Sequence, residues 1–281
     1  MIEKAYAKIN LGLNVLNKRE DGYHDIESIL LPLQLHDSVE VNVLKDGRDD
    51  LITCDIPTLS DSKSNVCHHA IELLREKYNF TERFRVNIHK RIFIQAGLGG
   101  GSADAAATIR CVIKLLKLEV NEEDILKIAL EVGCDVPWSI KSAPALIEKK
   151  GEKITYFDSS REDYVLLVKP LKGLSTKAVF EKSDELELEK CDLGLIKEKF
   201  LNDEDLNGIT KNALQQVAVT LVPEIESLIA LLKEEGLDFV MMSGSGTTVF
   251  GFTKNKKLAE KLEEKYFKKG YQVELTKLLK A

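Results

Sequence analysis

Alternation of apolar and polar residues predicts strands in the first part of the chain. Residues 9–15 carry isoleucine, leucine or valine at every second position, and residues 39–43 repeat this period with valine. Because successive side chains on a strand point to opposite faces, each segment should bury one face and expose the other. The segment at residues 164–170, with an apolar run before Lys169 and Pro170, predicts a further, buried strand.

Apolar residues at helical spacing predict helices elsewhere in the chain. We expect Ser64 to cap one helix and Ser102 to cap the helix that follows a glycine-rich loop, while Asn121 and the acidic residues after it should open another. The clearest helix runs from Pro223 to Glu235, with proline at its start and glycine after its end.

Two apolar runs at residues 239–242 and 248–252 flank the sequence Ser243-Gly244-Ser245-Gly246, which predicts a hairpin with a glycine-rich tip. The pattern of strands and helices restarts after about residue 155, and 281 residues are enough for two domains of ordinary size. We therefore predict one domain over residues 1–155 and a second over residues 156–281.

The negative net charge argues against nucleic acid and anionic membranes as partners. Charged residues make up 31% of the chain and the formal net charge is −6, so we expect no general electrostatic grip on nucleic acid or on an anionic membrane. The N-terminus lacks a positively charged lead before an apolar core, and no apolar run approaches the roughly 18 residues that span a bilayer. These features predict a cytoplasmic protein.

Cysteine and histidine give no sign of a metal site. The five cysteines are odd in number, scattered and free of any Cys-x-x-Cys spacing, so they are expected to be reduced thiols. His68 and His69 are adjacent and cannot share a helical face, and the other histidines form no ligand pattern. We predict no transition-metal site.

The most informative stretch is Gly97-Leu98-Gly99-Gly100-Gly101, which runs directly into an alanine-rich helix. Glycine allows positive φ and lets main-chain N–H groups approach a ligand without an intervening Cβ. First-turn N–H groups and the helix dipole would point back at this loop, so it is predicted to bind phosphate. The spacing fits neither a P-loop nor a dinucleotide fingerprint. An ordinary strand-to-helix turn is the alternative.

Polar residues near the N-terminus form two further candidates. Lys8 and Asn10 fall on the face of the first strand opposite its apolar stripe, where polar residues are usually just solvated. Asp21-Gly22 predicts a turn before Tyr23 and His24, whose rings are suited to stacking on and bonding to a planar ligand. A plain turn with a surface histidine is an equally good interpretation.

Asp135 follows a glycine that should end a helix, and its neighbours are small and apolar. Such a placement can make a carboxylate a positioned base, and an ordinary turn aspartate is an interpretation of similar weight. The Ser243–Gly246 tip likewise has two interpretations of equal weight, a flexible hairpin and a second anion-binding nest.

Taken together, these segments resemble the GHMP kinases, the superfamily of galactokinase, homoserine kinase, mevalonate kinase and phosphomevalonate kinase, over nearly the whole chain. The superfamily's three motifs are matched by Ala7–Leu11, by the glycine loop with Ser102 and by Ser243–Gly246. Within the superfamily the chain is most similar to the 4-diphosphocytidyl-2-C-methylerythritol kinases of non-mevalonate isoprenoid biosynthesis. The segments that carry this narrower resemblance are Lys8–Leu11, Arg19–His24, Gly133–Pro137 and Ser175–Thr176.

The resemblance implies an ATP-dependent, Mg²⁺-using small-molecule kinase that phosphorylates the 2-hydroxyl of a diphosphocytidyl sugar alcohol. Asp135 would be the catalytic base, and Lys8 its cationic partner near the acceptor hydroxyl. The implied substrate-binding residues are Asn10, Tyr23, His24, Thr176 and Phe180. The implied nucleotide-binding residues are Asn65, Lys90, Gly97, Leu98, Gly99, Gly100, Gly101, Ser102 and Ala103, and Ser102 is also a candidate Mg²⁺ ligand.

The implied fold is α+β in two domains. The N-terminal domain would be ribosomal-protein-like and carry the nucleotide loop, and the C-terminal domain would be ferredoxin-like. The implied partners are ATP and a small-molecule substrate, with neither nucleic acid nor membrane, in a monomer or a homodimer.

Three positions depart from the family pattern. Phe93 stands in place of a usual proline, and Ala103 in place of a serine, so one hydroxyl near the phosphates is lost. Lys149 replaces a glycine in a turn near the cytidine, and Lys150 adds an ammonium close to the base or its diphosphate. Either the turn is reshaped and the lysines help to hold phosphate, or the substrate preference has shifted.

Other functions compete with this one. The altered turn at Lys149 would suit another GHMP small-molecule kinase with a different acceptor, whereas Tyr23-His24 argues against it. A non-catalytic ligand-binding relative should have lost Lys8 or Asp135, and both are present. An RNA-binding role is opposed by the acidic balance and by the lack of a basic stripe.

Overall fold

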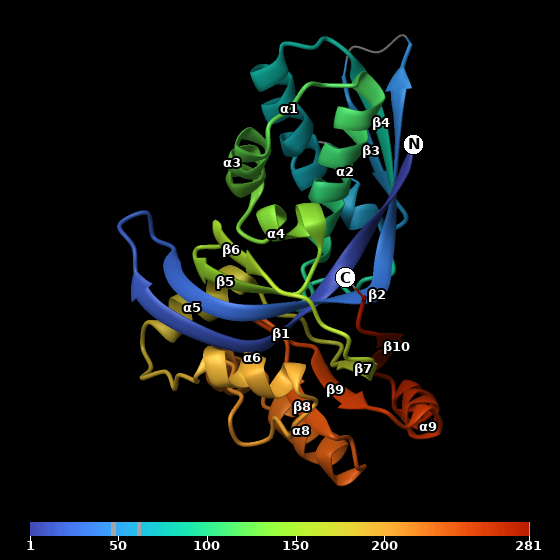
Figure 1. The fold of residues 1–281 in the computed structure, drawn as a ribbon. Coiled ribbons are helices and arrows are strands. Elements are labelled where there is room, and N and C mark those ends of the chain that lie inside the picture. The colour runs from blue at the N-terminus through green and yellow to red at the C-terminus, as the bar shows by residue number, and fades with distance from the viewer. Residues whose placement is uncertain (46–48, 61–62, 281) are drawn as a thin grey trace. The chain divides into compact units, whose positions relative to one another are not determined.

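The computed structural model describes residues 1–45, 49–60 and 63–280, which form helices and strands in two compact units (Figure 1). The first unit comprises residues 1–7, 35–92 and 99–142, and the second comprises residues 8–34, 93–98 and those from 143 onward. Two long strands, β1 (Ile2–Lys18) and β2 (His24–Leu44), contribute to both units. The predicted boundary at residue 155 lies inside the second unit and stays a prediction about domain organisation.

In the first unit a sheet packs against helices on one of its faces (Figure 1). β4 (Arg83–His89) pairs antiparallel with the second half of β2 and parallel with β3 (Leu51–Cys54). Inward valines of β2, such as Val39 and Val41, form one core with apolar residues of the helices. The helical elements are η1 (Pro57–Leu59), α1 (Val66–Tyr78), α2 (Gly100–Leu116), α3 (Glu122–Val132) and α4 (Val136–Lys141).

In the second unit the first half of β2 pairs antiparallel with β5 (Ala145–Lys149), which pairs with β6 (Lys153–Tyr156). A separate antiparallel sheet has the strand order β10-β7-β9-β8. Its strands are β7 (Tyr164–Lys169), β8 (Phe239–Met242), β9 (Val249–Thr253) and β10 (Gln272–Lys277). This order, with helices between β7 and β8 and between β9 and β10, confirms the ferredoxin-like prediction.

Each helix of the second unit buries apolar residues, and all except the helix at Leu193–Leu201 contribute them to one core with this sheet. They are α5 (Thr176–Ser183), α6 (Leu193–Leu201), α7 (Ala213–Leu221), α8 (Glu224–Glu234) and α9 (Lys256–Lys268). In the described part of the chain no single helix is long and apolar enough to cross a membrane; α7 and α8 reach that length together, bent by 117°, and both contribute to the core.

The helix starts test the predicted caps. Asn121 caps α3 as expected, and its side chain accepts a hydrogen bond from the backbone N–H of Asp124 at 2.8 Å. The predicted cap Ser64 is wrong, because Asn65 caps α1 and accepts from the Cys67 N–H at 2.9 Å. Ser102 is also wrong as a cap: α2 begins at Gly100, after Gly99 turns the chain with a φ of 72°, so that Ser102 lies inside the first turn. The left-handed turn at Gly99 therefore starts α2 earlier than the position of the Ser102 hydroxyl predicted.

Candidate active site

In the second unit the start of the glycine loop lies against the tip formed by Ser243–Gly246, between β8 and β9. The Ser243 hydroxyl donates to the Gly97 carbonyl at 2.9 Å, and the Thr248 N–H donates to the Ala96 carbonyl at 3.2 Å. A Cβ on Gly97, whose φ is 75°, would lie 2.1 Å from the Ser243 carbonyl oxygen. Glycine is therefore required here by the close approach of two chain segments as well as by the left-handed backbone.

Lys8 and Asn10 on β1 lie beside these two segments. The Lys8 N–H donates to the Leu98 carbonyl at 3.0 Å, and the Asn10 N–H donates to the Ser243 hydroxyl at 3.4 Å. The Lys8 ammonium donates to Asn10 Oδ1 at 2.6 Å, and these residues are only 5% and 3% exposed. The interpretation of this strand face as merely solvated is therefore wrong, because both polar residues are buried.

The glycine-rich tip is buried, and the predicted hairpin is confirmed by the antiparallel pairing of β8 with β9. A Cβ on Gly244 would lie 3.2 Å from both Lys8 Nζ and Asn10 Oδ1, which brings the tip backbone directly against the ammonium. The hydroxyls of Ser245 and Thr176 are 2.9 Å apart, so the tip also contacts the start of α5. Lys8, Asn10, Gly97, Leu98 and Thr176 thus gather around one tip.

A second group of predicted residues lies around His24. Its ring stacks on Phe180 of α5 at a centroid separation of 5.4 Å and an interplanar angle of 24°. The His24 Nε2 atom lies 2.7 Å from Asp184 Oδ1. Hydrogen bonds from Lys18 and His24 lower the pKa of the Asp184 carboxyl. Sequence reasoning missed Asp184, because it lies 160 positions away from His24. Tyr23, by contrast, is 53% exposed.

The unusual turn between β5 and β6 carries Lys150 onto Tyr23. Lys149 has a φ of 60°, a backbone that glycine adopts without strain. The Lys150 backbone N–H donates to Glu152 at 2.9 Å, and its ammonium lies 4.9 Å from the centre of the Tyr23 ring and 3.4 Å from Asp21 Oδ2. This cation–π contact places a positive charge on the ring expected to bind a planar ligand.

Replacing Lys149 with glycine should raise the free energy of unfolding by about 0.5–1 kcal/mol, because relief of left-handed strain outweighs the greater entropy of the unfolded chain. Urea denaturation measures the change. Thr155→Gly, inside the adjoining strand β6, should instead lower that free energy by about the same amount, since glycine weakens a strand interior. A loss of stability in Lys149→Gly would contradict the prediction.

In the first unit the glycine loop ends at the start of α2. The Ala103 N–H donates to the Gly99 carbonyl at 3.0 Å, the first bond of the helix. The N–H groups of Gly100, Gly101 and Ser102 precede that bond, so the helix leaves them for a ligand or water. Ala103 is buried in the core of the unit, so its side chain points away from the loop.

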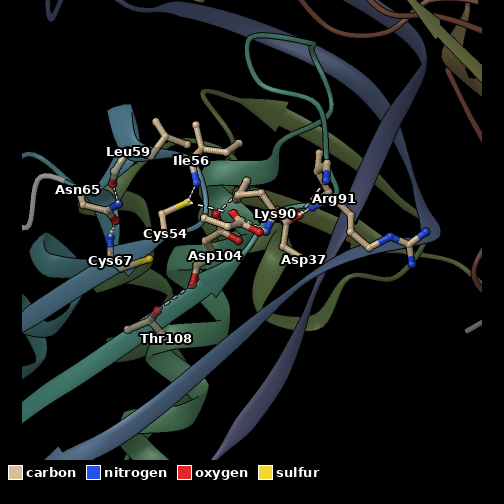
Figure 2. A network of polar contacts seen from close by, with 12 residues as sticks. Asp37, Cys54, Ile56, Leu59, Asn65, Cys67, Lys90, Arg91, Asp104 and Thr108 are labelled. Carbon is tan, nitrogen blue, oxygen red and sulfur yellow. Dashed lines mark hydrogen bonds and ion pairs between the residues drawn. The ribbon is translucent and has the colours of Figure 1, made fainter. Parts of the chain in front are cut away.

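Lys90 lies beside the glycine loop, in a buried cluster of charged residues (Figure 2). Its ammonium donates to Asp37 at 2.5 Å and to Asp104 of α2 at 2.8 Å, and it would lie 3.2 Å from a Cβ on Gly100. Asp37 also accepts from the backbone N–H groups of Arg91 and Ile92 at 2.5 and 2.8 Å. Lys90, which is predicted to approach a nucleotide, thus forms ion pairs with two carboxylates beside the glycine loop.

Within this cluster the two carboxylates share one ammonium. Burial raises the pKa of Asp104 to about 7, with Lys90 opposing the rise and Asp37 adding to it. Its Oδ1 atom has no hydrogen-bond partner among the described residues. Burial alone would lower the pKa of Lys90, but Asp104 and Asp37 outweigh this and raise it. The lysine is therefore a permanent charge, and the pKa of Asp104 lies near neutral pH.

The raised pKa of Asp104 predicts how the stability of the protein depends on pH. Asp104 titrates near its ordinary value of 3.8 when unfolded and near 7 when folded, so the folded state binds more protons between these values. Its contribution to stability should be fully present below about pH 4 and lost as the pH rises through 7. Urea denaturation at pH 5 to 8 should show the stability of the wild type falling relative to Asp104→Asn. A constant difference between the two proteins would contradict the assignment.

Asp135 and Asn65 also lie in the first unit. Asp135 occupies the N-cap position of α4, directly after α3 ends at Gly133, and its side chain makes no capping bond to the described residues of α4. Its backbone carbonyl accepts from the Ser139 hydroxyl at 2.8 Å. Asn65 is held at the start of α1, where its amide also donates to the Leu59 carbonyl at 2.9 Å. The residues predicted for one site are therefore divided between the units.

Within residues 1–45, 49–60 and 63–280 no group of three or more histidine, cysteine or acidic side chains could hold a metal ion.

Family models match both parts of the chain. The model described as GHMP kinases N terminal domain matches residues 65–145, and the model described as GHMP kinases C terminal matches residues 188–272.

Curated relatives cover most of the chain. A 4-diphosphocytidyl-2-C-methyl-D-erythritol kinase from Clostridium botulinum is 35% identical over 278 residues, which are 94% of this chain and 96% of the relative. A Streptococcus uberis protein, which bears the same kinase name as a provisional assignment, is 37% identical over 264 residues, or 93% of each chain.

Solved structures share the fold. A crystal structure of 4-(cytidine 5'-diphospho)-2C-methyl-D-erythritol kinase superimposes with a TM-score of 0.83 and 26% identity, covering 100% of both chains. Homoserine kinase from Cytophaga hutchinsonii gives a TM-score of 0.72 over 98% of this chain and 94% of its own, and at 16% identity the likeness concerns the fold alone.

Proposed function

The chain belongs to the GHMP kinases, and we propose that it transfers the γ-phosphoryl group of ATP to the 2-hydroxyl of 4-diphosphocytidyl-2-C-methyl-D-erythritol. Relatives at 35–37% identity over nearly the whole chain carry the name of this kinase. The observation that carries the proposal is the meeting of Lys8, Gly97 and the Ser243–Gly246 tip, since these belong to the three motifs of the superfamily. We propose that the enzyme acts in the cytoplasm on small molecules.

The glycine loop supports a role in binding the triphosphate. A loose phosphoryl-transfer transition state is stabilised mainly by positioning and by groups that neutralise phosphate charge. The N–H groups of Gly100, Gly101 and Ser102 at the start of α2 are suited to this, because the positive end of the helix dipole lies there. Mg²⁺, held by the phosphates with Ser102 as a candidate ligand, would supply further charge neutralisation.

Lys8 and Asp135 are proposed as the catalytic residues. The Lys8 ammonium, buried beside Asn10, would lower the pKa of the acceptor hydroxyl and fix its direction. Asp135 would accept the hydroxyl proton as the bond to phosphorus forms.

The aromatic residues are proposed to hold the diphosphocytidyl group. The stacked rings of His24 and Phe180 and the exposed ring of Tyr23 offer flat surfaces for a base. The Lys150 ammonium over Tyr23 favours an anionic ligand at the same place. Since this lysine departs from the family pattern, a kinase with a shifted acceptor is the second candidate function.

One experiment tests these alternatives. The purified protein is incubated with ATP and Mg²⁺ and with the diphosphocytidyl substrate, mevalonate, homoserine or galactose in parallel, and ADP release is followed. We expect turnover with the diphosphocytidyl substrate. Faster turnover with another acceptor would establish the shifted specificity, and no turnover with any acceptor would favour a non-catalytic relative.

A further inference from the structure

Asn212, which no motif singled out, joins the glycine-rich tip to the start of α7. The residue is 4% exposed, and its side-chain amide donates two hydrogen bonds, to the Met242 carbonyl at 2.9 Å and to the Gly244 carbonyl at 2.8 Å. Its Oδ1 accepts from the Leu214 N–H at 3.0 Å and so caps α7. Both amide hydrogens are thus used on the segment that enters the tip.

The neighbours of Asn212 tie the same segment to β1. The Leu13 N–H donates to the Lys211 carbonyl at 3.0 Å, and the Met242 N–H donates to the Gln215 side chain at 3.1 Å. β1 also carries Lys8, and a Cβ on Gly244 would lie 3.2 Å from its ammonium. The start of α7 is therefore bonded on one side to β1 and on the other to the tip that faces Lys8.

A helix cap alone does not require these contacts. A capping side chain needs one acceptor oxygen, and serine, threonine or aspartate supply it as well as asparagine does. Asparagine adds two N–H donors, and here one meets the Met242 carbonyl at the end of β8 and the other meets the Gly244 carbonyl in the tip. The two donors fix where the Gly244 backbone lies relative to the buried ammonium.

We propose that Asn212 is a positioning residue for phosphoryl transfer, which holds the Gly244 carbonyl so that the tip backbone keeps its place against Lys8. This inference rests on the proposed kinase function. A displacement of about 1 Å in a positioning group can cost about 100-fold in rate, so loss of the two donors should lower kcat far more than KM.

Two variants distinguish the effect of losing the amide donors of Asn212 from the effect of losing its cap on α7. Asn212→Ser keeps a capping oxygen and loses both amide donors, and Asn212→Asp keeps the shape of the side chain as a second variant. The matched control is Asn255→Ser, since Asn255 caps α9 in the same unit by accepting from the Leu258 N–H at 3.1 Å. We expect kcat to fall about 30- to 100-fold in both Asn212 variants, with KM for ATP changed less than threefold, and no change in the control.

Hydrogen exchange followed by mass spectrometry provides a readout that does not need activity. In both Asn212 variants the peptide with residues 243–248 should exchange at least tenfold faster, and Asn255→Ser should leave it unchanged. The proposal requires the loss of kcat and the faster exchange together, and the absence of either overturns it. A wild type that turns over no acceptor overturns the proposed function instead, while the exchange rates still decide whether Asn212 holds the tip.

Discussion

Replacing Lys8 with methionine should lower kcat with ATP and the diphosphocytidyl substrate by about 1,000-fold. Methionine matches the length of lysine but carries no charge, so the acceptor hydroxyl would lose the cation proposed to lower its pKa. The protein should stay folded, because the loss at Asn10 Oδ1 is one hydrogen bond, worth about 1–3 kcal/mol when a buried acceptor is left unpaired. Steady-state kinetics and thermal denaturation measure the two effects.

Lys4 provides the matched control, since it lies on the same strand and is exposed. Lys4→Met should keep wild-type kcat. Asp135→Asn should lose activity to a similar extent as Lys8→Met if the carboxylate is the base, because the amide cannot accept the hydroxyl proton. Activity within tenfold of the wild type in either catalytic variant would remove that residue from the proposed mechanism.

Local patterns predicted the elements of this chain because their causes are local. Asn121 opens α3 since its side chain and the N–H that it binds are three residues apart. The hairpin of β8 and β9 follows from two apolar runs joined by a short glycine-rich tip. The glycine loop could be recognised because glycine at several neighbouring positions carries an entropic cost that needs a structural reason. In each case a few consecutive residues contain the whole physical argument.

Contacts between distant segments could not be predicted in this way. Lys90 meets Asp37 across 53 positions and Asn212 meets the Gly244 carbonyl across 32, and no period in the sequence connects them. The burial of Lys8 depends equally on segments far along the chain, so its strand face resembled an ordinary solvated one. The signal that could have found Asp104 was a lone carboxylate among the alanines that begin the helix after the glycine loop.

The positive φ and the close contacts at Gly97 together predict the most damaging substitution to alanine in the glycine loop. Gly97→Ala would force a left-handed backbone on a residue with a side chain, which costs about 1–2 kcal/mol. It would also place a Cβ 2.1 Å from the Ser243 carbonyl oxygen, so the loop and the tip would have to separate. Core overpacking adds about 1–3 kcal/mol, and the free energy of unfolding should fall by about 2–5 kcal/mol.

Gly236→Ala separates the two causes, because Gly236 has a φ of 86° with nothing within 4 Å of the position of its Cβ. It should lose only the backbone term of about 1–2 kcal/mol and keep full activity. Gly97→Ala should in addition lose at least about 100-fold in kcat/KM for ATP, since the bond between the Ser243 hydroxyl and the Gly97 carbonyl would break and the loop would move from Lys8. Equal stability losses in the two variants, measured by urea denaturation, would mean that the tip yields to the new side chain; the glycine at position 97 would then be explained by its backbone conformation alone.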